Sequence, residues 1–142
     1  MKNTAGVPPL LLVEDSQSDI DLSLYAFNKI HFTNPIEICR NGTDVMEKMK
    51  EWEGGSPLPL CMLLDVKMPG MSGLEVLKIL KEKFLTVPVI MLTSSRENSD
   101  IDAAYALGAN SYIVKPVEMD RFIEIARQLN LYWMVLNSTP AG

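Results

Sequence analysis

The sequence predicts an α/β domain in which a parallel five-stranded sheet carries helices on both faces. Five short apolar runs alternate with longer amphipathic stretches in the order (βα)₅, and this alternation is typical of βαβ units. Three of the runs are continuously apolar, as strands buried on both faces of a sheet are. Acids, a hydroxyl residue or a lysine follow four of the five runs, which indicates a binding site at one edge of the sheet.

The expected strands are residues 10–13, 36–39, 60–64, 87–92 and 112–114. The second alternates apolar with polar residues, which favours an edge strand with one wet face. The fifth is short and contains Tyr112, so we expect it at the other edge.

Apolar residues at helical spacing predict a helix after each strand. Ser72 and Glu75 have the spacing of a capping box at the start of the third helix, and Gly108 stands where the fourth helix needs a C-terminal cap. The apolar stripes of the five helices, in chain order, are Ile20, Leu24, Phe27 and His31; Val45, Met49 and Trp52; Leu77, Leu80 and Phe84; Ile101, Ala104 and Tyr105; and Phe122, Ala126, Leu129 and Trp133.

Composition limits the class of protein. The 142 residues are 47% apolar and 22% charged, which predicts one globular domain over residues 1–142, with a core of about 8–129. Thirteen basic against 18 acidic residues give a net charge of −5, which argues against a nucleic-acid binder. No apolar run approaches the roughly 18 residues of a membrane span. Cys39 and Cys61 lie in apolar strings without a CxxC motif, so we expect buried reduced thiols in a cytoplasmic protein.

Functional side chains follow the ends of the expected strands. Glu14 and Asp15 follow the first strand, Asp65 the third, Thr93 the fourth and Lys115 the fifth. Because ligands of open α/β sheets bind beyond the carboxyl ends of the strands, we expect these side chains to converge. This convergence is more specific than any one of the residues; Asp15 alone would be read as a helix cap.

The chemistry of such a cluster is that of phosphoryl transfer. Carboxylates crowded together repel one another, and a divalent cation with oxygen ligands, Mg²⁺ above all, removes that repulsion. Lys115 and Thr93 suit phosphoryl oxygens as a charge and a hydrogen-bond donor. Asp65, alone at the end of the third strand, is the best candidate for a nucleophile that forms an aspartyl-phosphate.

From about residue 10 to 129 the chain resembles the receiver domains of two-component response regulators. The resemblance implies the flavodoxin-like fold with strand order 2-1-3-4-5. The matching motifs are LLVED at 11–15, LLDVKMPGMSG at 63–73, VIMLTS at 89–94, LGA at 107–109 and YIVKP at 112–116.

The resemblance implies a role for each residue near the metal. Asp65 would be the phosphoacceptor and a metal ligand, and Asp15 would bind Mg²⁺ directly. Glu14 would hold a metal-bound water, and the backbone carbonyl of Lys67 would complete the protein ligands. Mn²⁺ is expected to substitute for Mg²⁺.

The resemblance also implies a switch. Thr93 would donate to the phosphoryl group and swing inward, Lys115 would pair with that group, and the ring of Tyr112 would follow Thr93. Read without the resemblance, Tyr112 is a rim tyrosine with a satisfied hydroxyl. The phosphoryl donor would be a phosphohistidine on a sensor histidine kinase, and the switch would signal rather than turn over a substrate.

The C-terminal segment 130–142 extends beyond the expected core. Residues 131–136 would be apolar on all sides of a helix. This pattern favours a surface that binds a partner over a helix end that faces solvent. We therefore expect a homodimer with Trp133 in or beside the interface. With the long loop at Gly54 and Gly55, this tail resembles the stand-alone regulators that partner phytochrome-type kinases.

Two other functions use part of the same pattern. A haloacid-dehalogenase-like phosphatase with Asp65 as nucleophile would need a second acid two residues later, where Lys67 stands. A flavodoxin-like electron carrier would need a phosphate-binding loop after the first strand, and the acids Glu14, Asp15 and Asp19 would repel that phosphate.

Overall fold

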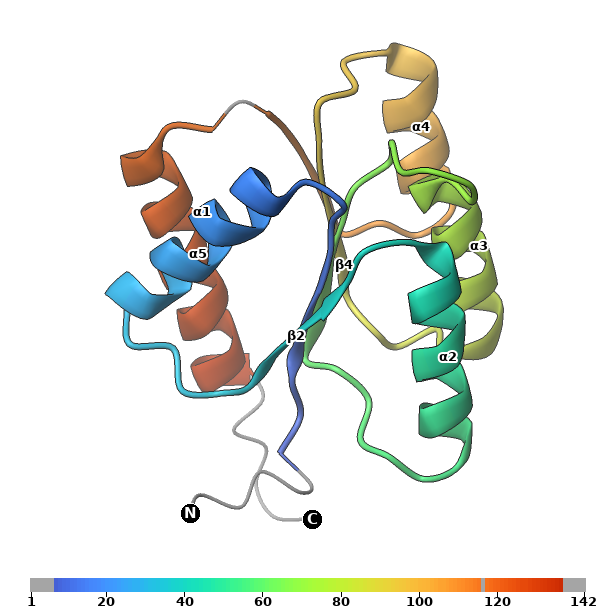
Figure 1. The fold of residues 1–142 in the computed structure, drawn as a ribbon, viewed down its shortest axis with the longest axis horizontal. Helices are drawn as coiled ribbons and strands as arrows, with labels where there is room; N and C mark the ends of the chain where they lie inside the picture. The colour runs from blue at the N-terminus through green and yellow to red at the C-terminus, as the bar shows by residue number, and fades with distance from the viewer. Residues whose placement is uncertain (1–6, 116, 137–142) are drawn as a thin grey trace. The chain divides into compact units, whose positions relative to one another are not determined.

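The structure is a computed structural model that describes residues 7–115 and 117–136, with side chains described up to Leu131. Five parallel strands form one sheet in the order β2-β1-β3-β4-β5 (Figure 1). The predicted strand order is confirmed, with the second and fifth strands at the edges. The strands are β1 (Leu10–Val13), β2 (Ile36–Cys39), β3 (Cys61–Leu64), β4 (Val89–Thr93) and β5 (Ser111–Val114).

The largest boundary difference from the sequence prediction is in β4. The strand begins at Val89 rather than at Val87, because Pro88 lacks an N–H and contributes only its carbonyl, which accepts the N–H of Met62 at 2.9 Å. At its other end the strand includes Thr93. The hydroxyl residue is therefore held by the sheet itself.

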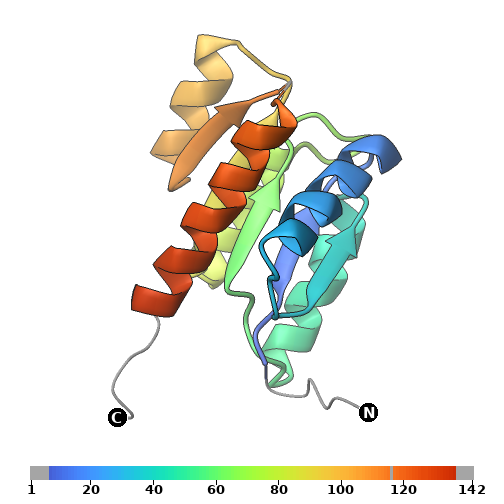
Figure 2. The ribbon, with the colours of Figure 1, turned by 90° about the vertical axis from the view of Figure 1, so that its left-hand side faces the viewer.

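The described helices are α1 (Gln17–Lys29), α2 (Gly42–Glu53), α3 (Gly73–Lys83), α4 (Asn98–Ala106) and α5 (Met119–Leu136). The chain divides into two compact units, Met1–Ser16 with Asn34–Pro116 and Gln17–Thr33 with Val117–Gly142. The first contains the whole sheet with α2, α3 and α4. The second contains α1 and α5, which pack side by side (Figure 2). The side chain of Trp133 lies outside the described residues, so the partner surface predicted there stays a prediction.

The core of the first unit lies between one face of the sheet and its three helices, on the right of Figure 1. Leu11, Met62 and Met91 project from the sheet into this core. Trp52 of α2 meets the ring of Phe84 edge-on, with 5.3 Å between ring centroids. The alternate residues of β1, β3 and β4 are buried as well, so these strands have two buried faces, as their continuous apolar runs predict.

Two residues after the end of α1, the backbone adopts a left-handed conformation at a residue that is not glycine. His31 has φ +58°, and it is the one such non-glycine residue in the described ranges. Its N–H donates to the Asn28 carbonyl, and the N–H of Phe32 donates to the Phe27 carbonyl, both at 3.1 Å. The Phe27 and Phe32 rings pack 5.1 Å apart. These bonds and the apolar contact form a Schellman motif with His31 at the position that glycine favours.

The structure corrects the sequence prediction for two residues that were assigned to the apolar stripes of helices. His31 lies beyond the end of α1 and is exposed, so it does not continue the stripe of that helix. Tyr105 of α4 is 49% exposed, and only Ala104 of that helix is buried. Helical periodicity identified the helices but could not tell where α1 ends or how narrow the buried face of α4 is.

His31→Gly is expected to raise the free energy of unfolding by about 0.5–1 kcal/mol. The left-handed conformation costs a non-glycine residue roughly 1–2 kcal/mol, and the greater freedom of glycine in the unfolded chain offsets part of the gain. Urea unfolding measures the difference. Gly55→Ala is the opposite control: Gly55, the residue after the C-cap Gly54 of α2, has φ +109° and open space around it, so this variant should lose stability through backbone strain alone. Equal or lower stability of His31→Gly would contradict the strain argument.

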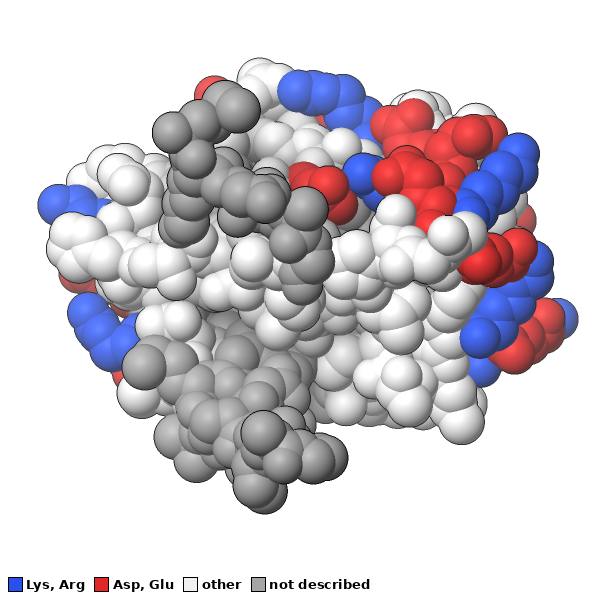
Figure 3. All heavy atoms as spheres, turned by 90° about the horizontal axis from the view of Figure 1, so that it is seen from below, with Lys and Arg blue, Asp and Glu red and all other residues white. Residues whose placement is uncertain are grey.

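Seen from below, charges of both signs gather on the right-hand side (Figure 3). Lys48 pairs with Glu37 at 3.2 Å, and Lys83 pairs with Glu53 at 3.4 Å. Surface pairs of this kind contribute about 0–1 kcal/mol each, so they add little to the stability of the fold.

In the part of the chain that the structure describes, no helix has the length and apolar character needed to cross a bilayer.

Candidate functional site

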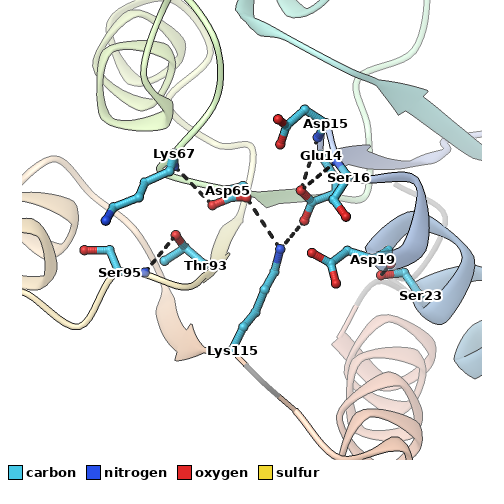
Figure 4. A network of polar contacts seen from close by, with 10 residues as sticks. All are labelled: Glu14, Asp15, Ser16, Asp19, Ser23, Asp65, Lys67, Thr93, Ser95 and Lys115. Atoms are coloured by element: carbon cyan, nitrogen blue, oxygen red, sulfur yellow. Dashed lines mark hydrogen bonds and ion pairs between the residues drawn. The ribbon is translucent and has the colours of Figure 1, made fainter.

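The carboxyl ends of four neighbouring strands bring the predicted site residues together (Figure 4). Glu14 and Asp15 follow β1, Asp65 follows β3, Thr93 ends β4, and Lys115 follows β5. All five belong to the first unit. The convergence that the strand ends predict is therefore present in the fold.

Three carboxylates form the acidic part of the site. One oxygen from each of Glu14, Asp15 and Asp65 lies within 4.8 Å of the others. Glu14 and Asp65 are buried, whereas Asp15 is exposed, so the cluster opens to solvent on the Asp15 side. Carboxylate oxygens at this spacing are the donor set that a hard divalent cation prefers.

Lys115 neutralises part of this negative charge. Its Nζ forms an ion pair with Glu14 and lies 3.5 Å from Oδ2 of Asp65, and Figure 4 shows the side chain extending from the end of β5 toward both carboxylates. Its backbone N–H donates to the Thr93 carbonyl at 2.8 Å. Sheet pairing therefore fixes the backbone from which this side chain extends, and the two carboxylates hold its ammonium group.

The charge balance of the site remains unfavourable without a cation. The pKa of the Glu14 carboxyl is raised to about 7: burial raises it most, Lys115 lowers it in part, and the charge of Asp65 raises it again. A raised carboxyl pKa means that the ionised form is disfavoured. A divalent cation among the three acids would favour the ionised forms, so the donor set fits such an ion.

Backbone contacts hold Asp65 in place. Its N–H donates to the Val13 carbonyl at 3.2 Å, and its Oδ1 accepts the N–H of Lys67 at 3.1 Å. Gly73, the first residue of α3, packs against the Asp65 carbonyl so closely that a Cβ there would lie 2.0 Å from that oxygen. The sequence motif contains Gly73, but nothing in its spacing reveals this contact.

Thr93 is fully buried and hydrogen-bonded away from the acids. Its Oγ1 accepts the N–H of Ser95 at 3.3 Å, and the hydroxyl of Tyr112 donates to the Ser95 carbonyl at 3.1 Å. No hydrogen bond joins Thr93 to Asp65 in the described ranges. Tyr112 is half-buried with a satisfied hydroxyl, and burial raises the pKa of its phenol.

Ser95 and Asp100 are site-adjacent residues that the sequence prediction missed. The segment from Ser94 to Asp100 reads as a polar entry to the fourth helix, yet Ser95 is only 1% exposed and donates to Asp100 at 2.5 Å. A buried hydroxyl within a polar string carries no periodic signal. Only the fold distinguishes it from its exposed neighbours.

Comparison with known proteins shows the family to which this chain belongs. The response regulator receiver domain model matches residues 10–127. The response regulator Rcp1 of Synechocystis is 30% identical over 95% of this chain and 96% of its own length. The probable methanogenesis regulatory protein FilR2 of Methanothrix harundinacea is 34% identical over 92% of this chain and 86% of its own length.

Solved structures agree with the sequence matches. The Mn²⁺-bound form of Rcp1 superposes with a TM-score of 0.77 at 29% identity, covering 94% of this chain and 99% of that one. The phosphorylated cyanobacterial phytochrome response regulator RcpA gives 0.79 at 26% identity, with the same coverage. The flavodoxin-like fold is confirmed. The chain belongs to the response regulator receiver family.

Proposed function

We propose that Asp65 accepts a phosphoryl group from a phosphohistidine of a sensor kinase. In this step a carboxylate oxygen of Asp65 bonds to phosphorus while the nitrogen–phosphorus bond of the donor breaks and the imidazole takes up a proton. The observation that carries the proposal is the buried Asp65 carboxylate, flanked by two further acids and by Lys115. The lysine ammonium is placed to pair with the added phosphoryl charge.

The acidic cluster fits a divalent cation, and we assign it to Mg²⁺, with Mn²⁺ as a substitute. Asp15, Asp65 and the Lys67 carbonyl would bind the ion directly, and Glu14 would act through a bound water. When bound, the ion would screen the negative charge of the incoming phosphoryl group. The three carboxylates and the Mn²⁺-bound form of Rcp1 support this assignment.

The signal is a change of shape rather than a released product. In this proposal Thr93 moves to donate to the phosphoryl group and Tyr112 follows it, so the chain acts as a stand-alone cytoplasmic switch and not as a turnover enzyme. Lys67 stands where a haloacid-dehalogenase-like phosphatase needs its second acid. Similarity to RcpA, a phytochrome response regulator, favours a phytochrome-type histidine kinase as the donor.

Acetyl phosphate with Mg²⁺ tests the proposal without the kinase. Intact-mass spectrometry should show one added phosphoryl group, stable in acid and labile in base, and EDTA should prevent its formation. The absence of any adduct with either acetyl phosphate or a panel of phosphorylated sensor kinases would overturn the proposal.

Lys115→Ala should still allow slow phosphorylation but should uncouple it from the movement of Thr93 and Tyr112. The ammonium contributes a charge-assisted contact that links the phosphoryl group to β5, while the metal supports the transfer. Amide chemical shifts of β4 and β5, recorded with and without acetyl phosphate, measure the coupling. Lys78→Ala, on an exposed position of α3, is the control. A phosphorylated Lys115→Ala protein with the wild-type shift changes would contradict this role.

We also propose a homodimer formed through the apolar segment 131–136. Burial of one large side chain contributes roughly 1.5–3 kcal/mol, so two segments joined symmetrically support measurable association. Light scattering should give a dimer mass for the full chain and a mass near that of the monomer after deletion of residues 131–142. A deletion variant that dimerises as tightly as the full chain would place the interface elsewhere.

A further inference from the structure

Gly42, the first residue of α2, lies in close contact with the side chain of Met71. A Cβ at Gly42 would lie 2.8 Å from Cβ, 3.0 Å from Sδ and 3.2 Å from Cγ of Met71. Gly42 is buried and helical, and it is not among the glycines with positive φ, so its backbone conformation suits other residues as well. What requires glycine here is the close approach of Met71.

The start of α2 is held firmly on its side of this contact. Oδ1 of the N-cap residue Asn41 accepts the N–H of Asp44 at 2.9 Å, and Oδ2 of Asp44 accepts the N–H of Arg40 at 3.0 Å. The helix then buries Val45 and Trp52 in the core. A hydrogen-bonded cap and a buried face therefore fix the position of the first residue of α2.

Met71 belongs to the loop between β3 and α3, which is held differently. At the start of the loop the Lys67 N–H donates to Oδ1 of Asp65 at 3.1 Å. In the part of the chain that the structure describes, no backbone hydrogen bond involves residues 68–71, and residues 69 and 70 are exposed. Met71 is half-buried and packs against the core of the first unit. Apolar packing, to which the contact with α2 contributes, therefore holds the middle of the loop.

The same loop carries the Lys67 carbonyl, which we assign to the cation, and Figure 4 shows the Lys67 backbone beside the Asp65 carboxylate. A side chain added at Gly42 cannot be avoided by rotating the Met71 side chain, because rotation about χ1 leaves Cβ where it is. Since the start of α2 is fixed, the backbone of the loop has to move. That movement displaces the carbonyl group upstream of Met71.

We propose that Gly42 and Met71 are positioning residues that set the affinity of the acidic cluster for a divalent cation. They act by holding the loop that carries the Lys67 carbonyl, so the inference rests on the proposed function and adds a determinant of its metal site. Changing a group that orients a metal ligand typically weakens metal binding by about 10-fold or more. A role in stability alone would change the free energy of unfolding and leave the dissociation constant for the cation unchanged.

The test measures the binding of Mn²⁺ to folded Gly42→Ala and Gly54→Ala by electron paramagnetic resonance of the free ion. The two substitutions are the same and lie at opposite ends of α2, but a Cβ at Gly54 meets only ordinary contacts, at 3.5 Å. Gly42→Ala should raise the dissociation constant about 10-fold, and Gly54→Ala should leave it unchanged. Phosphorylation of Gly42→Ala by acetyl phosphate should be slow at limiting Mg²⁺ and should reach the wild-type rate at saturating Mg²⁺, because the Asp65 carboxylate stays in place.

Variants of Met71 test the same contact from its other side, and they serve if Gly42→Ala fails to fold. Met71→Ala removes the Cγ and Sδ contacts and should weaken Mn²⁺ binding several-fold. Met71→Leu keeps an apolar side chain of similar volume and should bind Mn²⁺ as the wild type does. Met71→Gly removes all three atoms that meet the added Cβ, so Gly42→Ala should weaken binding no further in that background.

Failure of this inference is distinguishable from failure of the proposed function. A wild-type dissociation constant for Mn²⁺ in folded Gly42→Ala or in Met71→Ala overturns the positioning role alone. A slow phosphorylation of Gly42→Ala that saturating Mg²⁺ does not restore does the same, because the substitution then acts on the nucleophile. A wild-type protein that binds no Mn²⁺ overturns the cation assignment of the proposed function.

Discussion

Asp65→Asn is expected to take up no phosphoryl group from acetyl phosphate under conditions that modify the wild type completely. The amide has the same shape as the carboxylate and can still accept the Lys67 N–H, so the fold should be retained. It lacks the ionised oxygen that attacks phosphorus, and it removes one of the three charges of the cation site. Intact-mass spectrometry and base lability of the adduct measure the effect.

Asp15→Asn separates the nucleophile from the metal site. This change also removes one carboxylate of the cluster but leaves Asp65 intact, so phosphorylation should slow and should recover in part at higher Mg²⁺ concentration. Asp65→Asn should show no such recovery. A stoichiometric adduct on Asp65→Asn would put the nucleophile at another residue.

Gly73→Ala is expected to lower the free energy of unfolding by about 3 kcal/mol or more. The added Cβ would lie 2.0 Å from the Asp65 carbonyl oxygen and 2.9 Å from Cα of Val66. Both are backbone atoms, so no side-chain rotation relieves the overlap, and β3 and α3 must move apart. Urea unfolding measures the loss, and phosphorylation of any folded fraction should be slower because Asp65 moves with its backbone.

Gly54→Ala is the control for that substitution. A Cβ at Gly54 meets only ordinary contacts, at 3.5 Å, and its φ of −83° suits alanine. Its stability should stay near the wild-type value or rise slightly, since alanine loses less entropy on folding. A Gly73→Ala protein as stable as Gly54→Ala would show that α3 does not approach the Asp65 carbonyl this closely.

The sequence predicts the sheet and the main site residues because their signals are local. Continuous apolar runs identify β1, β3 and β4, and an acid, a hydroxyl or a lysine at the end of a parallel strand must meet its counterparts at the same edge. Glu14, Asp65 and Lys115 could therefore be brought together from the chain alone. The side chains that surround each of these residues follow from the rule that parallel strands end at the same edge of the sheet.

The remaining features depend on packing that no local pattern encodes. Ser95 and Ser94 are adjacent hydroxyls, yet one is buried and the other exposed, because the segment turns after β4. Gly73 looks like an ordinary first residue of a capped helix, and its importance comes from the approach of α3 to Asp65. His31 completes an apolar spacing by chance of sequence, while the helix has already ended.

The two buried cysteines have a consequence for redox chemistry. Both thiols are unbridged, and burial raises the pKa of Cys39 and of Cys61 to about 12. Thiol oxidants and alkylating reagents attack the thiolate, and burial both keeps these thiols protonated and shields them from such reagents. Peroxide and disulfide stress therefore have no ready target at either thiol in the folded chain, and its cysteines do not make it an oxidation sensor.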